Sequence, residues 1–513
     1  FCFFEKKIIH NGMGETRAKK LSIPKLMENS VFRLVDPPSY VFLVPVILLL
    51  IIQLPHLSLP YFWDEAWSYM VAIDKMAEVG PSLFPGAVPI DICKGHPQFF
   101  YFAAAFWMNL FPGKILYMRI LPLLISVAVL VFVFYGLKRL TSLQTANVGV
   151  ILLGVQSMFL AQSILVLPEM MLSLWLVISF FSFVRQNFKT YAVAGSLMIL
   201  TKETALVFVV IFLLCYLLFS IKRNGGNRFA AKSFLWVITP ILVYSAFLIL
   251  HKAKFGVFFF QEHLGYISYD FAAISKKIGS AFTIAFIHYG RIMIFAAIAI
   301  FFVVLIAKRA NVKNRNALLC LALLIFAYLL FLGINFYSPR YTLSLVVLLI
   351  LAFSILFDQL PVSWIFKMSF ALIVSSICLF YSLNSKRNID IDLGYVEVIE
   401  VNREMVKYCE DNNFYNEPIA ASFNMNYCLK NKVTGYLKGP EVFRQVGGFN
   451  QYKNAKYFIY ESTSDKDPVI ELVRSDFKLV KAFANKHAWG YIYENTARSE
   501  ERRVGKECRS RWS

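Results

Sequence analysis

Two adjacent carboxylates, Asp64 and Glu65, stand among aromatic residues in the stretch YFWDEAWSYM, residues 61–70. A carboxylate that aromatic side chains such as Trp63 and Trp67 shield from water becomes a stronger base, so Asp64 could accept a proton from a hydroxyl group. The alternative is structural, because acidic residues in the first turn of a helix are stabilised by free backbone NH groups and by the helix dipole.

Other ionisable residues stand near the ends of apolar runs. Each alone has an ordinary explanation as a turn residue, a first-turn acid, or an anchor that reaches the membrane surface. Ionisable groups at membrane depth are unfavourable, however, so a cluster of them on one side of the membrane indicates a functional site. These residues are Lys94, His96, Glu169, Lys202, Glu203, Arg340 and Tyr341.

Together these residues have the chemistry that sugar transfer from a lipid phosphate needs. One carboxylate must take the proton of the attacking hydroxyl, and cations must neutralise the departing phosphate. Lys202 and Arg340 suit the second task, since Arg binds phosphate through two hydrogen bonds and Lys acts as a point charge. The carboxylates could also bind a divalent metal, but no ligand spacing requires one, so we expect no obligatory cofactor.

The composition predicts a membrane protein that crosses the bilayer many times. Hydrophobic residues make up 58% of the 513 and charged residues only 16%, against about 45–50% and about 25% in soluble domains. The net charge of +20 does not indicate a nucleic-acid partner, because the basic residues lie between apolar runs and not in one patch.

A spanning helix needs about 20 mostly apolar residues. The run at 98–111 is short and flanked by prolines, so we expect a helix that lies along the membrane surface. The remaining runs predict about eleven spans, at 39–55, 118–137, 143–165, 170–185, 190–201, 204–221, 233–250, 281–306, 316–334, 341–357 and 365–383.

The basic loops support this threading. With the amino end in the cytoplasm, four loops assigned to the inside carry Lys or Arg and lack Asp and Glu, as the positive-inside rule expects. A span at 98–111 would move all of these cations outside. They are Lys138, Arg139, Arg185, Lys189, Lys222, Arg223, Arg228, Lys232, Lys308, Arg309, Lys313 and Arg315.

The composition changes after the last apolar run. Residues 384–497 are rich in Lys, Asp, Asn and Glu, which predicts a separate soluble domain on the outer side. Helical spacing at 396–412 and β-rich stretches at 455–462, 477–483 and 489–494 predict a small α/β unit. The expected fold is thus an all-α polytopic membrane domain with a small C-terminal α/β extracytoplasmic domain. A disulfide between Cys409 and Cys428 is one alternative for this domain, and free thiols are the other.

We expect foreign residues at both ends of the chain. Met13 or Met27 could be the native start, so residues 1–12 are doubtful, and 498–513 resemble a translated sequencing adapter. Residues 1–38 would then form a cytoplasmic segment. Residues 39–383 would form the transmembrane domain, with a large first outer loop at 56–117.

FWDEAWSYMVAIDKM and GHPQFFYFAAAFWMNLFPGKILYMRILPLL resemble the opening of GT-C fold membrane glycosyltransferases. The resemblance is to the glycosyltransferase family 39-like group, which includes protein O-mannosyltransferase and aminoarabinose lipid A transferase relatives. In this group an acidic pair in the first outer loop precedes a His-Pro-Pro-Leu or Lys-Pro-Pro-Leu stretch and an Arg-Leu-Pro. The chain keeps Asp64-Glu65, His96-Pro97 and Arg119-Ile120-Leu121-Pro122.

The resemblance extends over about 38–345 and includes PEMML, TKETAL and SPRYTL. It implies an inverting transfer from a dolichyl- or undecaprenyl-phosphate sugar to an acceptor hydroxyl on the outer face. Two positions depart from the pattern: Gln98 stands where the group has a second proline, and Glu169 where relatives often carry an aspartate. The implied roles are Asp64 as base, Glu65 as its support, Glu169 as a second acid, Lys202, Arg340 and Tyr341 at the donor phosphate, and Lys94, His96, Glu203 and Trp67 around the substrate cavity.

Two other functions remain open from the sequence. A transporter or flippase of lipid-linked saccharides would also expose charges in a membrane cavity, and a membrane scaffold would carry an exported binding domain. For an enzyme of this kind we expect the plasma (inner) membrane as location. Its partners would be a polyprenyl-phosphate sugar, an acceptor lipid, glycan or protein, and membrane lipid.

Overall fold

The computed structural model describes residues 39–111, 114–223, 231–307, 312–384, 389–463, 469 and 477–495. All of them belong to one compact unit, Ser39–Ser513. The expectations for residues 1–38 and for the adapter-like tail at 498–513 fall outside the described residues.

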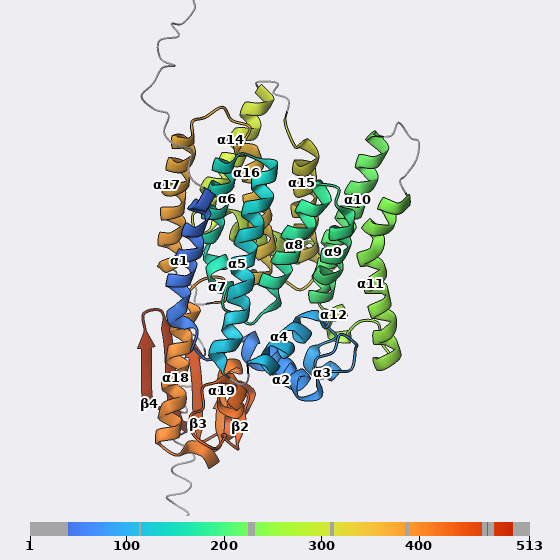
Figure 1. Cartoon of the computed structure of the whole chain (residues 1–513). Coiled ribbons are helices and arrows are strands. Elements are labelled where there is room, and N and C mark those ends of the chain that lie inside the picture. The colour runs from blue at the N-terminus through green and yellow to red at the C-terminus, as the bar shows by residue number, and fades with distance from the viewer. Residues whose placement is uncertain are drawn as a thin grey trace, which may run out of the picture. The chain divides into compact units, whose positions relative to one another are not determined.

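The described chain is a multi-pass membrane protein. Its helices run alongside one another in a bundle (Figure 1). Within the described residues, six helical segments are long and apolar enough to cross a bilayer, since about 20 residues at 1.5 Å each span about 30 Å. They are Ile115–Leu140 (α5), Glu203–Ser220 (η5, Glu203–Ala205, with α10, Leu206–Arg223), Lys232–Phe255 (in α11, Ala231–Phe255), Arg315–Ile334 (α15), Pro339–Phe357 (η7, Pro339–Thr342, with α16, Leu343–Phe357) and Trp364–Leu383 (α17).

A seventh candidate span is broken by a sharp bend. Phe271–Ile287 (α13, Phe271–Phe282, with the π-helical turn η6, Thr283–Ile287) meets α14 (Arg291–Ala307) at 88°. Gly290 lies at the break with φ 81°, a conformation that glycine adopts without strain. The span predicted at 281–306 is therefore divided between the end of α13 with η6 on one side of the bend and α14 on the other.

Shorter apolar helices account for the remaining predicted spans. They are Tyr40–His56 (around α1, Leu43–Gln53), α6 (Leu143–Gly154), α8 (Pro168–Val184) and α9 (Phe188–Thr201). The predicted span at 143–165 is interrupted after α6 and continues as the short α7 (Ser157–Gln162). Their length alone does not decide whether each crosses the bilayer, so the count of eleven stays a prediction. The expected surface helix is α4 (Phe99–Leu110), about 18 Å long.

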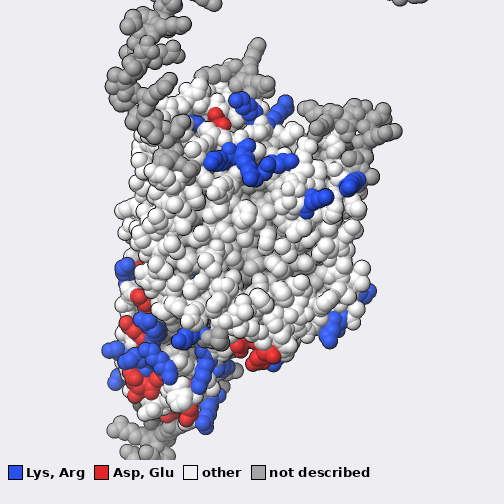
Figure 2. Space-filling view, in the orientation of Figure 1, with Lys and Arg blue, Asp and Glu red and all other residues white. Residues whose placement is uncertain are grey.

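Charged side chains are segregated along the bundle. On the face shown in Figure 2, Lys and Arg gather at the end away from the sheet, and a broad belt without charged side chains separates them from the other end. Three loops meet at the basic end, because Ser142 donates to Asp358 at 2.7 Å and Asn314 donates to the Leu140 carbonyl at 2.9 Å. This distribution agrees with a hydrophobic belt in lipid.

Short elements cover the other end of the bundle. The segment after α1 forms the π-helical turn η4 (Glu65–Tyr69), α2 (Met70–Val79) and α3 (Ile90–Cys93) before α4. Farther along the chain, α12 (Gln261–Gly265) lies near α3, since Lys94 Nζ and a Glu262 carboxylate oxygen are 3.9 Å apart. These elements and the turns between them carry five of the ten predicted site residues: Asp64, Glu65, Trp67, Lys94 and His96.

The C-terminal part confirms the predicted small α/β unit. Its five strands have the order β2-β1-β3-β5-β4, parallel among the first three and antiparallel beyond. One face of α18 (Tyr395–Asp411) is buried, and Cys409 and Cys428 are separate buried thiols. The other elements are α19 (Phe423–Lys430), β1 (Ile419–Ala421), β2 (Val446–Gly447), β3 (Tyr457–Ser462), β4 (Phe477–Asn485) and β5 (Ala488–Asn495).

This unit is packed directly on the bundle. The Tyr61 backbone NH donates to the Thr434 carbonyl at 2.9 Å, and Gln162 Nε2 donates to the Asp390 carbonyl at 2.6 Å. Gly435 has φ 86° and approaches Ile115 so closely that a Cβ there would collide with it. The contact brings residues from the two parts of the chain to opposite walls of one cavity.

Candidate active site

Arg340 is the centre of a buried ionic network. Its side chain is 5% exposed and donates to three carboxylates from distant parts of the chain. Nε is 3.1 Å from Glu169 Oε1, Nη1 is 2.8 Å from Asp390 Oδ2, and Nη2 donates to Asp64 Oδ2. A planar guanidinium can satisfy several carboxylates at once, whereas an ammonium group lacks this fixed fork of donors.

Lys202 adds a second cation to the network. Its Nζ is 2.7 Å from Glu169 Oε1 and lies 3.6 Å from the centre of the Tyr341 ring. The other Glu169 oxygen, Oε2, has no hydrogen-bond partner among the described residues. Five of the predicted residues thus come together in one cluster, although they lie on four separate segments of the sequence. They are Asp64, Glu169, Lys202, Arg340 and Tyr341.

Asp64 reaches this cluster because of the local backbone around it. Trp63 has φ 46° and turns the chain into η4, and Asp64 is at the N-cap position of that helix without a side-chain capping hydrogen bond. Its Oδ1 accepts a hydrogen bond from Trp67 Nε1 at 2.8 Å, while Oδ2 accepts from Arg340. The carboxylate is therefore held by two directed donors, and its side chain is 20% exposed.

Glu65 points to a different partner. It is fully buried, and Arg119 Nη2 lies 3.3 Å from its Oε2. The backbone NH groups of Val166 and Phe62 also donate to it, at 2.6 and 2.9 Å. Burial raises the pKa of Glu65 above its usual value, and the Arg119 charge opposes this shift. Its geometry thus fits a support for the segment that carries Asp64.

His96 and Glu203 form a second cluster with His263. His96 Nδ1 is 2.9 Å from Glu203 Oε2, and the two histidine rings have centroids 5.0 Å apart. One ligand atom from each of the three lies within 4.8 Å of the others, an arrangement that could hold a divalent metal ion such as Zn²⁺. The sequence predicted no metal site, because His263 lies 167 positions from His96 and no local spacing links them. Lys94 is next to this cluster and pairs with Glu262.

Asp390 is the network residue that sequence reasoning missed. It lies after α17 on the short stretch that leads into α18, and its carboxylate is bound to Arg340. Burial raises the pKa of Asp390, while Arg340 opposes the rise. The one signal in the sequence was the pair of acids in NIDIDLG directly after the last apolar run, where the chain becomes polar.

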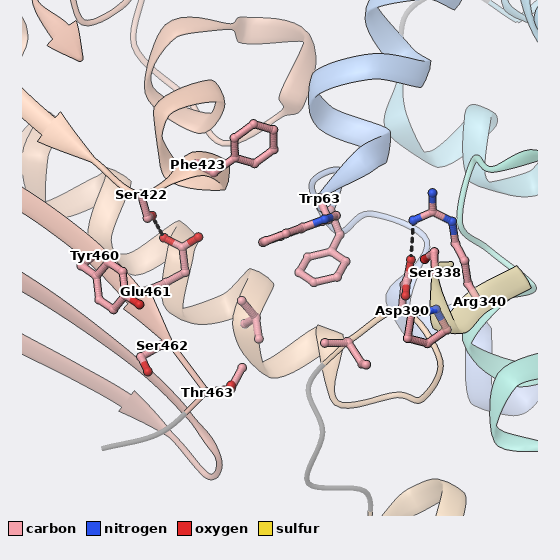
Figure 3. Close-up of a pocket in the computed structure, with 14 residues that line it drawn as sticks. Trp63, Ser338, Arg340, Asp390, Ser422, Phe423, Tyr460, Glu461, Ser462 and Thr463 are labelled. Carbon is pink, nitrogen blue, oxygen red and sulfur yellow. Dashed lines mark hydrogen bonds and ion pairs between the residues drawn. The ribbon is translucent and has the colours of Figure 1, made fainter. Parts of the chain in front are cut away.

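A cavity of about 580 Å³ opens beside this network. Figure 3 shows Arg340 and Asp390 on one side, with Trp63 near them, and Ser422 and Glu461 on the opposite side. The Ser422 hydroxyl donates to the Glu461 carboxylate. Burial raises the pKa of Glu461 to about 7, and the Ser422 hydrogen bond opposes this rise. None of the residues on the Glu461 side was predicted as part of a site.

Comparison with solved structures identifies the fold. ArnT from Cupriavidus metallidurans bound to undecaprenyl phosphate matches with a TM-score of 0.53 and 13% identity, over 89% of this chain and 98% of that one. The apo state of the same protein gives 0.52 and 11% over the same shares. This chain therefore has the fold of ArnT, as the expected GT-C resemblance implied.

A third structure is the archaeal oligosaccharyltransferase AglB from Archaeoglobus fulgidus in complex with an inhibitory peptide and a dolichol-phosphate. It has a TM-score of 0.49 and 12% identity, over 88% of this chain and 73% of that one. No protein-family model matches the sequence. No curated protein sequence matches it either.

Proposed function

We propose that this protein is a membrane glycosyltransferase that takes a sugar from a polyprenyl-phosphate donor and transfers it to an acceptor hydroxyl on the outer face of the plasma membrane. The observation that carries the proposal is the network in which Arg340 joins Asp64 to Glu169, with Lys202 on the same Glu169 oxygen. Both a base and two cations are thus within one cluster beside a cavity. The likeness of fold to ArnT, which is bound to undecaprenyl phosphate in one structure, supports a lipid-phosphate donor.

In the proposed reaction Asp64 is the general base. The acceptor oxygen attacks the anomeric carbon from the side opposite the phosphate, and its proton passes to the Asp64 carboxylate. The bond between the anomeric carbon and the phosphate oxygen breaks, and the electron pair leaves with polyprenyl phosphate. The new glycosidic bond then has the inverted configuration.

Arg340 and Lys202 would stabilise the charge that develops on the departing phosphate. In the structure both cations are bound to carboxylates, so the donor phosphate must replace at least one of these contacts. When Arg340 turns to the phosphate, Asp64 Oδ2 is released to accept a proton, while Trp67 still holds Oδ1. Donor binding would thereby prepare the base.

Polyprenyl phosphate release tests the proposal. The detergent-purified protein is given a panel of polyprenyl-phosphate sugars with a crude membrane acceptor extract. We expect donor-dependent release by the wild type, and Asp64→Asn to lower it by about 10²–10⁴-fold, because the substitution keeps the shape and removes the base. Asp74→Asn is the matched control, since this partly buried acid lies outside the network. Equal release by Asp64→Asn and wild type would reject Asp64 as base, and no release from any donor would reject the activity.

A further inference from the structure

The cavity beside Arg340 has two chemically different ends. The bundle end carries Arg340, which the proposed reaction uses, and its ion-pair partner Asp390. The opposite end is formed by the sheet, with Ser422 after β1, Glu461 in β3 and Thr463 after it. Transfer of a sugar from a lipid phosphate gives these sheet residues no role, so their chemistry requires a separate explanation.

Two exposed aromatic side chains line the cavity between these ends. Trp63 is 44% exposed and Phe423 is 49% exposed. Their ring centroids are 5.9 Å apart and their planes are inclined by 52°. Large aromatic side chains usually become buried in a folded protein, and exposed ones in a cavity are typical of ligand sites. The electron-rich faces suit the C–H groups on one side of a sugar ring.

Glu461 supplies hydrogen-bond acceptors at the sheet end. A carboxylate has about four acceptor positions, and the Ser422 hydroxyl fills one. Among the described residues no Lys or Arg forms an ion pair with Glu461, so its charge is not already neutralised by a cation. Neighbouring hydroxyl groups on a sugar could donate to the positions that remain.

The charge at the sheet end of the cavity disfavours an anionic acceptor. Arg340 is the one Lys or Arg among the described residues that line it, and three carboxylates already bind this cation. Asp390 and Glu461 are both in the wall. At the sheet end a uronic acid or a phosphorylated headgroup would therefore meet the ionised form of Glu461 with no cation to offset it, whereas a neutral or amine-bearing group would not be repelled.

The sheet also disfavours an extended peptide. β3, which carries Glu461, lies between β1 and β5 and pairs with both. Its backbone groups are used within the sheet, so a peptide could not add to it as a further strand. Recognition at this wall must come from side chains.

We propose that this cavity binds the acceptor, that the acceptor is an uncharged or amine-bearing saccharide, and that Glu461 and Ser422 bind its hydroxyl groups at the end far from Asp64. This inference rests on the proposed function, because the accepting hydroxyl must reach Asp64 while the rest of the saccharide fills the cavity. The volume of about 580 Å³ is within the usual range of small-ligand sites, about 300–1,000 Å³.

Direct binding provides the first test. The purified full-length protein is titrated with trisaccharides of neutral hexoses, N-acetylhexosamines, hexosamines and uronic acids, and separately with Ser/Thr peptides and anionic phospholipid vesicles. We expect binding of neutral or amine-bearing saccharides, weakened at least tenfold by Glu461→Gln and by Ser422→Ala and unchanged by Asp74→Asn. The inference is overturned if no saccharide binds, if these variants bind equally, or if peptides or vesicles respond to the variants instead.

A chemical block provides the second test. It does not depend on whether Glu461→Gln and Ser422→Ala fold correctly. Thr463→Cys places a thiol on the exposed rim, and the six cysteines of the described chain are buried. We expect N-ethylmaleimide to abolish saccharide binding by this variant and to leave undecaprenyl phosphate binding unchanged. Glu404→Cys, exposed on α18, is the labelled control. Retained saccharide binding by the labelled Thr463→Cys protein would contradict the inference.

The two proposals fail in different ways. If the protein is not a glycosyltransferase, the wild type releases no polyprenyl phosphate from any donor. If only the acceptor inference is wrong, donor-dependent release persists and is insensitive to Glu461→Gln, Ser422→Ala and the maleimide block.

Discussion

Arg340 binds three carboxylates through three different nitrogen atoms, so its shape matters as much as its charge. We predict that Arg340→Lys lowers polyprenyl phosphate release at least tenfold and lowers the thermal midpoint. One ammonium group cannot replace the guanidinium fork, and the acids are then less well neutralised. Release assays and thermal unfolding in detergent measure the two effects.

Lys75→Ala is the control for Arg340→Lys. Lys75 pairs with Glu78 on an exposed face, where water screens the two charges and such a pair contributes little to stability. A lysine at position 340 that supported normal release and stability would show that charge alone is sufficient there.

Glu461 makes stability depend on pH. Its pKa is about 7 in the folded protein, against 4.5 for the unperturbed group. Between these values the folded state binds more protons than the unfolded state, so the free energy of unfolding falls as pH rises from about 4.5 to 7. We predict that Glu461→Gln removes this loss. The free energy of unfolding of the variant minus that of the wild type should then be larger at pH 8 than at pH 4.5, by up to about 3 kcal/mol.

Thermal midpoints of wild type and Glu461→Gln at several pH values between 4.5 and 8 check this prediction. The difference between the two proteins should grow up to about pH 7 and then stay constant. A difference that does not change with pH would mean that the carboxyl has an ordinary pKa.

Residue types and order were sufficient to predict much of the cluster. Asp64, Glu169, Lys202 and Arg340 were identified because each is ionisable and stands at the end of an apolar run on the same expected side. Asp390 and Glu461 lack that contrast, since both lie in a polar stretch where acidic residues are common. Only the folded chain shows that one reaches Arg340 and the other lines the cavity.

At the scale of elements, the buried pair of Glu65 and Arg119 joins η4 to α5. Arg119 also donates to the backbone carbonyls of Leu59, Pro60 and Ile164. We predict that Glu65→Gln destabilises the protein by about 3–5 kcal/mol, because it leaves a buried cation without its counter-ion. Polyprenyl phosphate release should fall as well, since Asp64 is the preceding residue.

A double-mutant cycle with Arg119→Met tests the coupling. The Glu65→Gln/Arg119→Met double variant should lose less stability than the sum of the two single changes. Thermal midpoints provide the comparison. Additive losses would mean that the two side chains do not interact despite the 3.3 Å between them.

The helices were easier to predict than their interruptions. Hydropathy located the apolar segments, but it could not show the break after α6 or the 88° bend before α14. The π-helical turn at η4 was equally invisible, and it matters most for the site. Together with Trp63 in a left-handed conformation, it directs Asp64 and Glu65 to different arginines.

At the scale of the whole molecule, the charge pattern predicts which end of the protein faces the cytoplasm and which faces the outside. We expect a cysteine at Glu404, exposed on α18, to react with a membrane-impermeant maleimide in intact cells. A cysteine at Thr190, exposed near the start of α9, should react only after permeabilisation, because its loop carries Arg185 and Lys189. The reverse result would place the site on the cytoplasmic side.

Gly435 lets the C-terminal unit approach Ile115 with no side chain between them, so the two walls of the cavity come from parts of the chain that are far apart in the sequence. The wall with Arg340 belongs to the bundle, and the wall with Glu461 belongs to the sheet. Substitutions on the sheet can therefore change one wall while the other stays intact. If the proposed function holds, such a chain can acquire a new acceptor preference, in evolution or in the laboratory, without changes to Arg340 and the carboxylates that it binds.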